Sequence, residues 1–292
     1  MPPDHEFDVP QPLGNPPCEL AECPMWNVGE QALYWTDIPN GAIWKYDPTH
    51  DTTHKVWQGD RQVGGLAFAT DGRLVLCTDQ GVALLDPTAG RVEPVEMWWV
   101  PLTADERFND VTTDSVGRLL AGTLTERRTD GVLYRMEAGR RPVAMLRDLH
   151  TSNGMTFRPE EGVFYHTDSR PGIITRYIYD PATGDICDPA VIYRSDEAAG
   201  SPDGLTIDRE GCLWTACYRG GRVRRLSPEG RVLAEIRLPT PNVTSVTFGG
   251  ADLRDLYITT ARRQGAGPED PGGQVFRVRV AVGGRPEWPV RL

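Results

Sequence analysis

The chain has no long apolar stretch, no basic start and no excess of positive charge. No segment approaches the roughly 18 apolar residues needed to span a bilayer. The opening residues, MPPDHEFDVPQPLGNPP, lack the basic and apolar regions of a signal peptide. The net charge of −10 argues against a nucleic-acid partner and against an anionic membrane. We therefore expect a cytoplasmic protein, a monomer or small homo-oligomer, with a small-molecule or metal ligand.

Several common site signatures are also missing. The six cysteines form no C-x-x-C pair and no Cys/His cluster with zinc spacing. There is no G-x-S-x-G elbow and no P-loop. Without an export signal the cysteines are expected to be free thiols, although their even number leaves a disulfide open.

A short pattern does return six times along the chain, in the segments AECPMW, GGLAF, NDVTT, NGMTF, DGLTI and TSVTF. Each copy is followed by an apolar run, such as LYWTD or VFYHTD, and then by an alternating segment that opens with Gly. A weaker fourth run, such as HKVWQG or VEPVEMWW, follows most copies. Alternation with β-branched and aromatic residues is typical of strands, and repetition at a period of roughly 40–50 residues indicates one stacked structural unit.

Four antiparallel strands per unit, repeated about an axis, are the blades of a β-propeller. The prediction is thus an all-β, six-bladed β-propeller, a single domain over residues 1–292, with a central metal-binding channel. The outermost strand of the last blade comes either from the N-terminal segment 1–15, around Phe7–Val9, or from Trp288–Leu292. We favour the N-terminal source because it would lock the ring. The alternatives are an open β-sandwich or two smaller β domains, neither of which predicts a fixed register over all copies.

One register position carries oxygen-bearing side chains in four of the six copies. The residues at this position are Glu22, Gly64, Asn109, Asn153, Asp203 and Thr244. If the first strand of each blade lines the channel, Glu22, Asn109, Asn153 and Asp203 meet there. Two carboxylates and two carboxamides suit one divalent cation such as Ca²⁺, Mg²⁺, Mn²⁺ or Fe²⁺, and zinc remains possible. The competing interpretation is that each Asn or Asp merely shapes a turn.

Such a site is suited to metal-assisted hydrolysis. A bound cation polarises a carbonyl and makes water easier to deprotonate. Asp203 is then a candidate both as ligand and as proton acceptor. Arg107, two residues before Asn109, is a candidate for holding substrate oxygens with its fork of donors, or else a surface arginine.

At these residues the chain resembles the SMP-30/gluconolactonase family, also called the regucalcin family. The matching segments run from AECPMW through RFND, SNGMTF and SPDGLTID to LPTPNVTSVTFGG, which covers nearly the whole chain. The resemblance implies a six-bladed propeller with one divalent cation held by Glu22, Asn153 and Asp203, with Asp203 as the base. It places Arg107 and Asn109 against substrate, and so moves Asn109 from the metal to the sugar. Members hydrolyse sugar lactones, and the segments YHTDS, LWTACYRGG and LPTPNVT are most similar to bacterial sugar-acid lactonases, including xylonolactonases.

Two departures from the family pattern bear on the substrate. Val111 stands where the family motif has glycine, and Glu126, Arg127 and Arg128 follow GTL, where an acidic residue can meet sugar hydroxyls. Glu126 and Arg127 are therefore added as candidate substrate-binding residues. The arginines fit either a substrate with an extra carboxylate or phosphate, or a solvated loop.

The prediction is a metal-dependent lactonase that opens an aldono-1,4- or 1,5-lactone, such as xylonolactone or gluconolactone, to its aldonic acid. The rival enzyme is a promiscuous metal-dependent esterase or phosphotriesterase. The rival without catalysis is a propeller that binds calcium or a protein partner.

Overall fold

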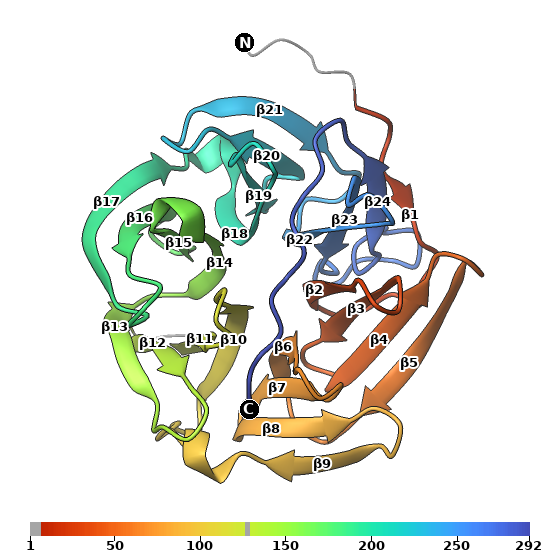
Figure 1. Cartoon of the computed structure of the whole chain (residues 1–292). Coiled ribbons are helices and arrows are strands. Elements are labelled where there is room, and N and C mark those ends of the chain that lie inside the picture. The colour runs from red at the N-terminus through yellow and green to blue at the C-terminus, as the bar shows by residue number, and fades with distance from the viewer. Residues whose placement is uncertain (1–6, 126–128) are drawn as a thin grey trace.

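The computed structural model describes residues 7–125 and 129–292, which form a ring of six four-stranded antiparallel sheets (Figure 1). The six-bladed propeller predicted from the repeats is confirmed. Within the described residues the helices are three short 3₁₀ turns, η1 (Glu96–Trp98), η2 (Pro159–Glu161) and η3 (Glu197–Ala199). No helix in this part of the chain is long and apolar enough to cross a bilayer.

The strands follow one another outward in each blade. The first three blades contain β2 (Ala21–Asn27), β3 (Ala32–Asp37), β4 (Ala42–Asp47) and β5 (Thr52–Gln58); β6 (Val63–Phe68), β7 (Leu74–Thr78), β8 (Gly81–Asp86) and β9 (Arg91–Pro94); β10 (Glu106–Thr113), β11 (Leu119–Thr125), β12 (Gly131–Met136) and β13 (Val143–Leu149). The next two contain β14 (Ser152–Arg158), β15 (Val163–Asp168), β16 (Ile173–Tyr179) and β17 (Ile186–Arg194); β18 (Ser201–Ile207), β19 (Leu213–Tyr218), β20 (Arg222–Leu226) and β21 (Val232–Arg237). The last contains β22 (Val243–Gly249), β23 (Asp255–Thr260), β24 (Phe276–Arg279) and β1 (Gln11–Pro12).

The last blade is completed by the N-terminal segment. β1 pairs antiparallel with β24, so Gln11 lies opposite Arg277 and Pro12 opposite Phe276. The favoured source of this strand was the N-terminal segment, but the pairing residues lie just beyond Phe7–Val9. One expected outer strand is also shorter than the segment VEPVEMWW: β9 ends at Pro94 and the turn η1 follows it.

The C-terminal segment has a different place from the alternative considered for it. After β24 the chain crosses the centre of the ring (Figure 1). Gly284 donates its backbone N–H to Leu253, and Val290 donates its own to Phe68. Trp288–Leu292 therefore adds no blade strand. The residues that this segment contacts lie at or just after the ends of the first strands of the blades. The segment therefore crosses the channel at the end where those strands finish.

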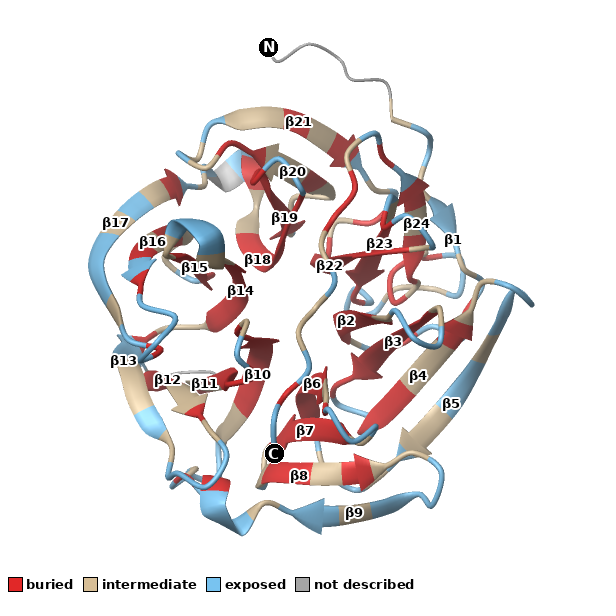
Figure 2. Ribbon diagram, viewed as in Figure 1, coloured by how far each residue is buried: buried red, intermediate tan, exposed pale blue. Residues whose placement is uncertain are grey.

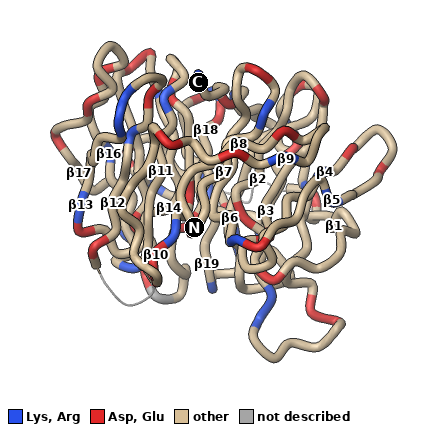
Figure 3. The backbone as a smooth tube through the Cα atoms, turned by 90° about the horizontal axis from the view of Figure 1, so that it is seen from below, with Lys and Arg blue, Asp and Glu red and all other residues tan. Residues whose placement is uncertain are grey.

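Burial explains the apolar runs of the repeat. The first three strands of the blades are largely buried, whereas outermost strands such as β5 and β9 are mostly exposed (Figure 2). A run buried on both faces needs no polar alternation. Cores form between neighbouring blades: Trp26 stacks on Tyr257 across the junction of the first and last blades, with ring centroids 5.6 Å apart. Acidic and basic residues are interspersed over the outside (Figure 3).

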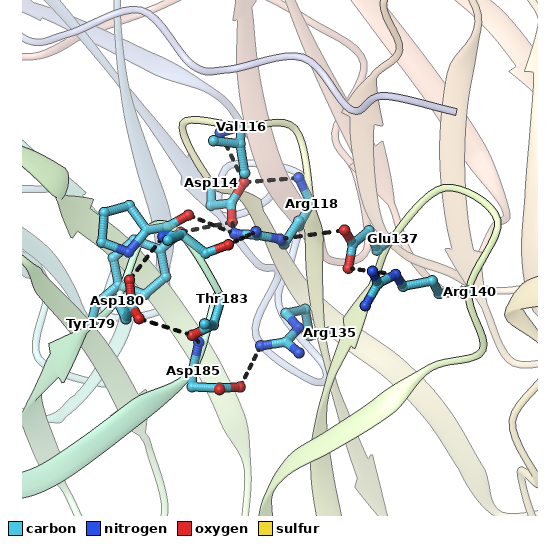
Figure 4. A network of polar contacts seen from close by, with 12 residues as sticks. Asp114, Val116, Arg118, Arg135, Glu137, Arg140, Tyr179, Asp180, Thr183 and Asp185 are labelled. Atoms are coloured by element: carbon cyan, nitrogen blue, oxygen red, sulfur yellow. Dashed lines mark hydrogen bonds and ion pairs between the residues drawn. The ribbon is translucent and has the colours of Figure 1, made fainter.

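A buried ion pair of the third blade also forms hydrogen bonds with the fourth blade (Figure 4). Asp114 follows β10 and accepts hydrogen bonds at Oδ2 from Arg118 (3.0 Å) and from the Tyr179 hydroxyl (2.7 Å). Arg118 also donates to the backbone oxygens of Pro181 (3.0 Å) and Ala182 (2.8 Å). Asp114 is fully buried and Arg118 nearly so, and these bonds hold the two blades together.

Candidate functional site

Neighbouring blades meet through their first strands, which close a ring around the channel. Each of these strands has a break in its pairing register at or beside the position aligned in sequence. The breaks lie at Glu22/Met25, Val63/Gly65, Phe108/Val111, Asn153/Met155, Pro202/Leu205 and Val243/Ser245. A bulge redirects side chains and is common beside active sites. The position that the six sequence copies share therefore lies at or beside a β-bulge in the first strand of every blade.

The glycines beside the ligand candidates permit close approach between strands. A Cβ on Gly154 would lie 2.4 Å from the backbone oxygen of Asp203 and 2.4 Å from the backbone nitrogen of Leu205. A Cβ on Gly204 would lie 2.0 Å from Oγ of Ser245. The Asn-Gly and Asp-Gly pairs thus lie inside β14 and β18 rather than at hairpin turns, which removes the simple turn interpretation.

Two ring positions are not ligand positions. A Cβ on Gly64 would lie 2.0 Å from the backbone oxygen of Phe108, so glycine here lets the second and third blades touch. The Thr244 hydroxyl donates to the backbone oxygen of Ala21 at 2.6 Å and bonds Thr259 at 2.8 Å. Both positions hold neighbouring strands together.

The carboxamides of Asn109 and Asn153 are joined across the junction of the third and fourth blades. Nδ2 of Asn109 donates to Oδ1 of Asn153 at 3.0 Å and to the backbone oxygen of Ser152 at 2.8 Å. Nδ2 of Asn153 donates to Oγ of Ser169 at 2.9 Å. Since a backbone oxygen only accepts, the bond to Ser152 fixes which way the Asn109 amide points.

Arg107 occupies the other end of this chain of hydrogen bonds. It donates to Oδ1 of Asn109 at 2.6 Å and to the backbone oxygen of Phe108 at 2.9 Å. It also lines a cavity of about 410 Å³ together with residues that include Gln62, Asp79 and Leu124. Arg107 therefore links a cavity large enough for a small ligand to the ring of polar residues. The other two substrate candidates, Glu126 and Arg127, lie outside the described residues.

Glu22 and Asp203 are buried carboxylates whose charges act on each other. They are 7% and 6% exposed. Burial, and then the charge of Asp110, raises the pKa of Glu22, while a backbone hydrogen bond from Cys23 and the charge of Arg107 oppose the rise. Burial, and then the charges of Glu22 and Asp110, raises the pKa of Asp203. A buried cluster of negatively charged carboxylates is unfavourable unless a bound cation or protonation neutralises the charge.

The donor set fits a divalent cation. Oδ1 of Asp203 is buried and receives no hydrogen bond from any residue in 7–125 or 129–292. A buried acceptor without a partner is costly, and a metal ion would satisfy it. Those same described residues contain no group of three His, Cys, Asp or Glu side chains placed to hold a metal. A cation bound by Glu22 and Asp203 would therefore need a third protein ligand of another kind, and the carboxamide of Asn153 is the candidate that the aligned register offers.

Two supporting features were missed by sequence reasoning. Asp110 is 9% exposed and acts electrostatically on both carboxylates, yet strict strand alternation would have turned it away from the channel. The bulge at Asn109–Asp110 is what brings it in. Ser169, which supports Asn153, follows β15 directly, and the polar ending of the segment FYHTDS was the available signal.

Val111, the departure from the family motif, is accommodated by the neighbouring blade. It is 6% exposed and packs in the core between the second and third blades. A Cβ on Gly65 would lie 2.7 Å from Cγ1 of Val111, so that glycine leaves room for the larger side chain.

His166 lies behind the ring and supports it. Its Nε2 bonds Oγ of Ser152 at 2.8 Å, and its side chain is buried. Burial lowers the pKa of His166 to about 4, while the charge of Asp168 opposes the shift. His166 is therefore neutral at pH 7 and holds the strand that carries Asn153.

The fold and the ring together define a class: six-bladed propellers with an oxygen-lined site in the central channel. Residues 20–262 match the model of the SMP-30/Gluconolactonase/LRE-like region. The chain belongs to this family.

Similar proteins agree with this assignment. The chain is 34% identical to a pentonolactonase of Haloferax volcanii, over 93% of this chain and 94% of that protein. It is 38% identical to a 6-deoxy-6-sulfogluconolactonase of Pseudomonas putida, over 92% and 94%. Among solved structures, a luciferin-regenerating enzyme aligns with TM-score 0.88 at 27% identity, over 98% of this chain and 100% of that one. A regucalcin of Agrobacterium tumefaciens, described as a calcium-binding protein, aligns with TM-score 0.90 at 23% identity over 98% of both chains and supports the fold alone.

Proposed function

We propose that this protein is a lactonase that uses one divalent cation to hydrolyse a sugar lactone to the corresponding aldonic acid. The observation that carries the proposal is the buried oxygen of Asp203 that no described residue bonds, beside Glu22 in a ring that also includes Asn153. The relatives named above as a pentonolactonase and a sulfogluconolactonase favour a sugar lactone as the substrate.

The ligand set would be Glu22, Asn153 and Asp203. A divalent cation bound there supplies positive charge for the lactone carbonyl and lowers the pKa of bound water. Asn153 presents Oδ1 because Asn109 and Ser169 fix its amide at both ends. A carbonyl oxygen has two lone pairs, so Oδ1 is able to accept the Asn109 bond and still face a cation.

The chain's own groups would move the proton and hold the sugar. Water attacks the lactone carbonyl carbon, and Asp203 accepts the proton that the water loses. When the bond from the carbonyl carbon to the ring oxygen breaks, that proton passes to the new hydroxyl. Arg107, at the boundary of the cavity and the ring, binds sugar oxygens with its guanidinium. Xylonolactone and gluconolactone are the proposed type of substrate.

A pH-indicator assay on metal-stripped protein, with single divalent ions added back, tests this function. The panel contains xylono-, glucono-, galactono- and arabinonolactone. We expect metal-dependent turnover that falls by about 10³-fold in Asp203→Asn, within the range for losing a general base. The matched control is Asp188→Asn, which changes an exposed aspartate on β17. Hydrolysis no faster than the spontaneous rate with every ion would contradict the proposal and favour a phosphotriesterase or a binding propeller.

A further inference from the structure

The cavity that Arg107 lines has walls from two blades. Gln62 precedes β6 and Asp79 follows β7, so both belong to the second blade, whereas Arg107 lies on β10 of the third. The volume of about 410 Å³ is within the range of about 300–1,000 Å³ that is usual for small-molecule sites. A ligand in this cavity would therefore contact side chains of both blades.

The carboxylate of Asp79 lacks a hydrogen-bond partner at one oxygen. Oδ1 of Asp79 is buried and accepts no hydrogen bond from any residue that the structure describes, a condition that it shares with Oδ1 of Asp203. The backbone N–H of Asp79 donates to the backbone oxygen of Gln62 at 3.2 Å, which fixes the residue at the wall of the cavity. A buried acceptor without a donor is costly, and a ligand that donates hydrogen bonds would supply the missing partner.

The other two acids of the cavity have partners within their own loop. Oδ1 of Asp105 accepts the Thr103 hydroxyl at 2.9 Å, and Oε2 of Glu106 accepts the Thr103 backbone N–H at 3.3 Å. Together with Asp79, three carboxylates and one guanidinium line the cavity among the described residues. A negatively charged ligand would thus meet more repulsion than attraction there, so the lining favours a neutral one.

Asp79 and Arg107 offer complementary bonds to a ligand. A carboxylate only accepts hydrogen bonds, and a guanidinium only donates them. A hydroxyl does both, so the hydroxyls of one sugar are able to donate to Asp79 and to accept from Arg107. A phosphotriester or a simple ester carries acceptors alone and has no donor for Asp79. The two side chains together therefore match a polyhydroxylated ligand.

We propose that Asp79 is a specificity-determining residue that accepts a hydrogen bond from a hydroxyl of a neutral sugar lactone. The inference rests on the proposed function and narrows its substrate to uncharged lactones with free hydroxyls. A site built to bond a substrate hydroxyl rejects analogues that lack it, because its buried acceptor is then left without a partner.

Binding of a sugar lactam tests the role of Asp79 separately from catalysis. Glucono-1,5-lactam keeps the hydroxyls of gluconolactone and resists hydrolysis, so calorimetric titration at saturating metal measures its dissociation constant. We expect Asp79→Ala to raise this constant by about 10–100-fold, the range for a hydrogen bond to a charged group. Asp79→Asn, which keeps the shape of the side chain and removes its charge, should raise it by a smaller factor. The matched control is Asp71→Ala in the turn before β7, whose side chain is 44% exposed and whose loss should leave the affinity unchanged.

Steady-state kinetics give a second readout. The value of kcat/KM for gluconolactone should fall in Asp79→Ala by the same factor as the lactam affinity. δ-Valerolactone has the same ring without hydroxyls, so the natural protein and the variant should hydrolyse it equally well. Gluconolactone phosphorylated at its sixth carbon should be a poorer substrate than gluconolactone, because the lining acids repel the phosphate.

Each result has a definite meaning. The role of Asp79 is overturned if the natural protein does not bind the lactam, if both variants bind it unchanged, or if Asp79→Ala loses both lactones equally. A preference for the phosphorylated lactone overturns the neutral substrate class. Asp79→Asn decides if Asp79→Ala fails to fold, which circular dichroism would reveal. Lactone turnover with unchanged lactam binding contradicts this inference and leaves the proposed function standing, whereas lactam binding that depends on Asp79 without any lactone turnover does the reverse.

Discussion

The side-chain amide of Asn109 donates a hydrogen bond to Oδ1 of Asn153 across the junction of two blades, at 3.0 Å. Because the cationic guanidinium of Arg107 donates to Oδ1 of Asn109 at 2.6 Å, a metal cation at the same oxygen would be repelled by a like charge. The position of Asn109 in the ring is therefore better explained by orienting Asn153 than by binding metal. This geometry supports the interpretation drawn from the family, in which Asn109 is not a metal ligand. It also gives Asn109 a role in positioning Asn153.

Asn109→Ala tests that role. Residues that orient a metal ligand typically contribute 10–100-fold to affinity, so we expect the dissociation constant for the activating cation to rise by about 10-fold or more. Calorimetric titration of stripped protein measures it, with Asn27→Ala, a change near the end of β2, as control. Unchanged metal affinity with a raised KM would show that Asn109 acts on substrate alone.

Gly154→Ala should destabilise the protein strongly. The new Cβ would lie 2.4 Å from backbone atoms of β18, and these cannot move aside as the end of a flexible side chain can. Overpacking of this kind costs about 1–3 kcal/mol, occasionally more. Urea unfolding measures the change, and Gly29→Ala is the control, because its Cβ would meet only Oδ1 of Asn27 at 3.4 Å. Equal stability of the two variants would contradict the close approach.

His166 should make folding sensitive to acid. Its pKa is about 4 in the folded protein, against an ordinary value of 6.5 for histidine. The unfolded chain therefore binds more protons between these pH values, and stability falls as the pH falls. The loss is up to about 3 kcal/mol by pH 4, at roughly 1.36 kcal/mol per pKa unit. His166→Gln, which keeps a donor toward Ser152, should show a shallower decline in urea unfolding over this range; identical slopes would refute the assignment.

The buried ion pair of Figure 4 and a surface ion pair beside it make a matched comparison. Asp114→Asn removes the carboxylate nearest to the buried Arg118, at 3.0 Å, and leaves only Glu137, at 3.9 Å, so we expect a loss near the lower end of the about 3–5 kcal/mol that breaking a buried pair costs. Asp185 also pairs with an arginine, Arg135, but its side chain is 70% exposed. Asp185→Asn should therefore change the free energy of unfolding by less than about 1 kcal/mol. Chemical unfolding of both variants checks the difference, and equal losses would show that burial does not govern these pairs.

Sequence periodicity was enough to predict the propeller, because each repeat carries its own strand signals and its own channel residue. It did not predict the bulges, since alternation describes regular strands and Asp110 owes its place to an irregular one. Nor did it place the C-terminal segment: the sequence around Trp288 resembles a short strand, and only three-dimensional closure of the ring creates the channel end that it covers. Features that depend on contacts between distant segments carry no local signal.

Arg107→Ala separates the proposed lactonase from its enzymatic rival. Arg107 bonds Asn109 and lines the adjacent cavity, so its loss removes donors for sugar oxygens and loosens the support of Asn153. We expect kcat/KM for the preferred sugar lactone to fall by about 10²-fold, since a charge-assisted bidentate contact contributes several kcal/mol. Arg107→Lys should recover only part, because lysine lacks the planar fork. A phosphotriesterase with an apolar substrate would keep its rate in Arg107→Ala. Steady-state kinetics on a lactone and on a phosphotriester, at saturating metal, distinguish the two, and an unaffected lactonase rate would remove Arg107 from the substrate site.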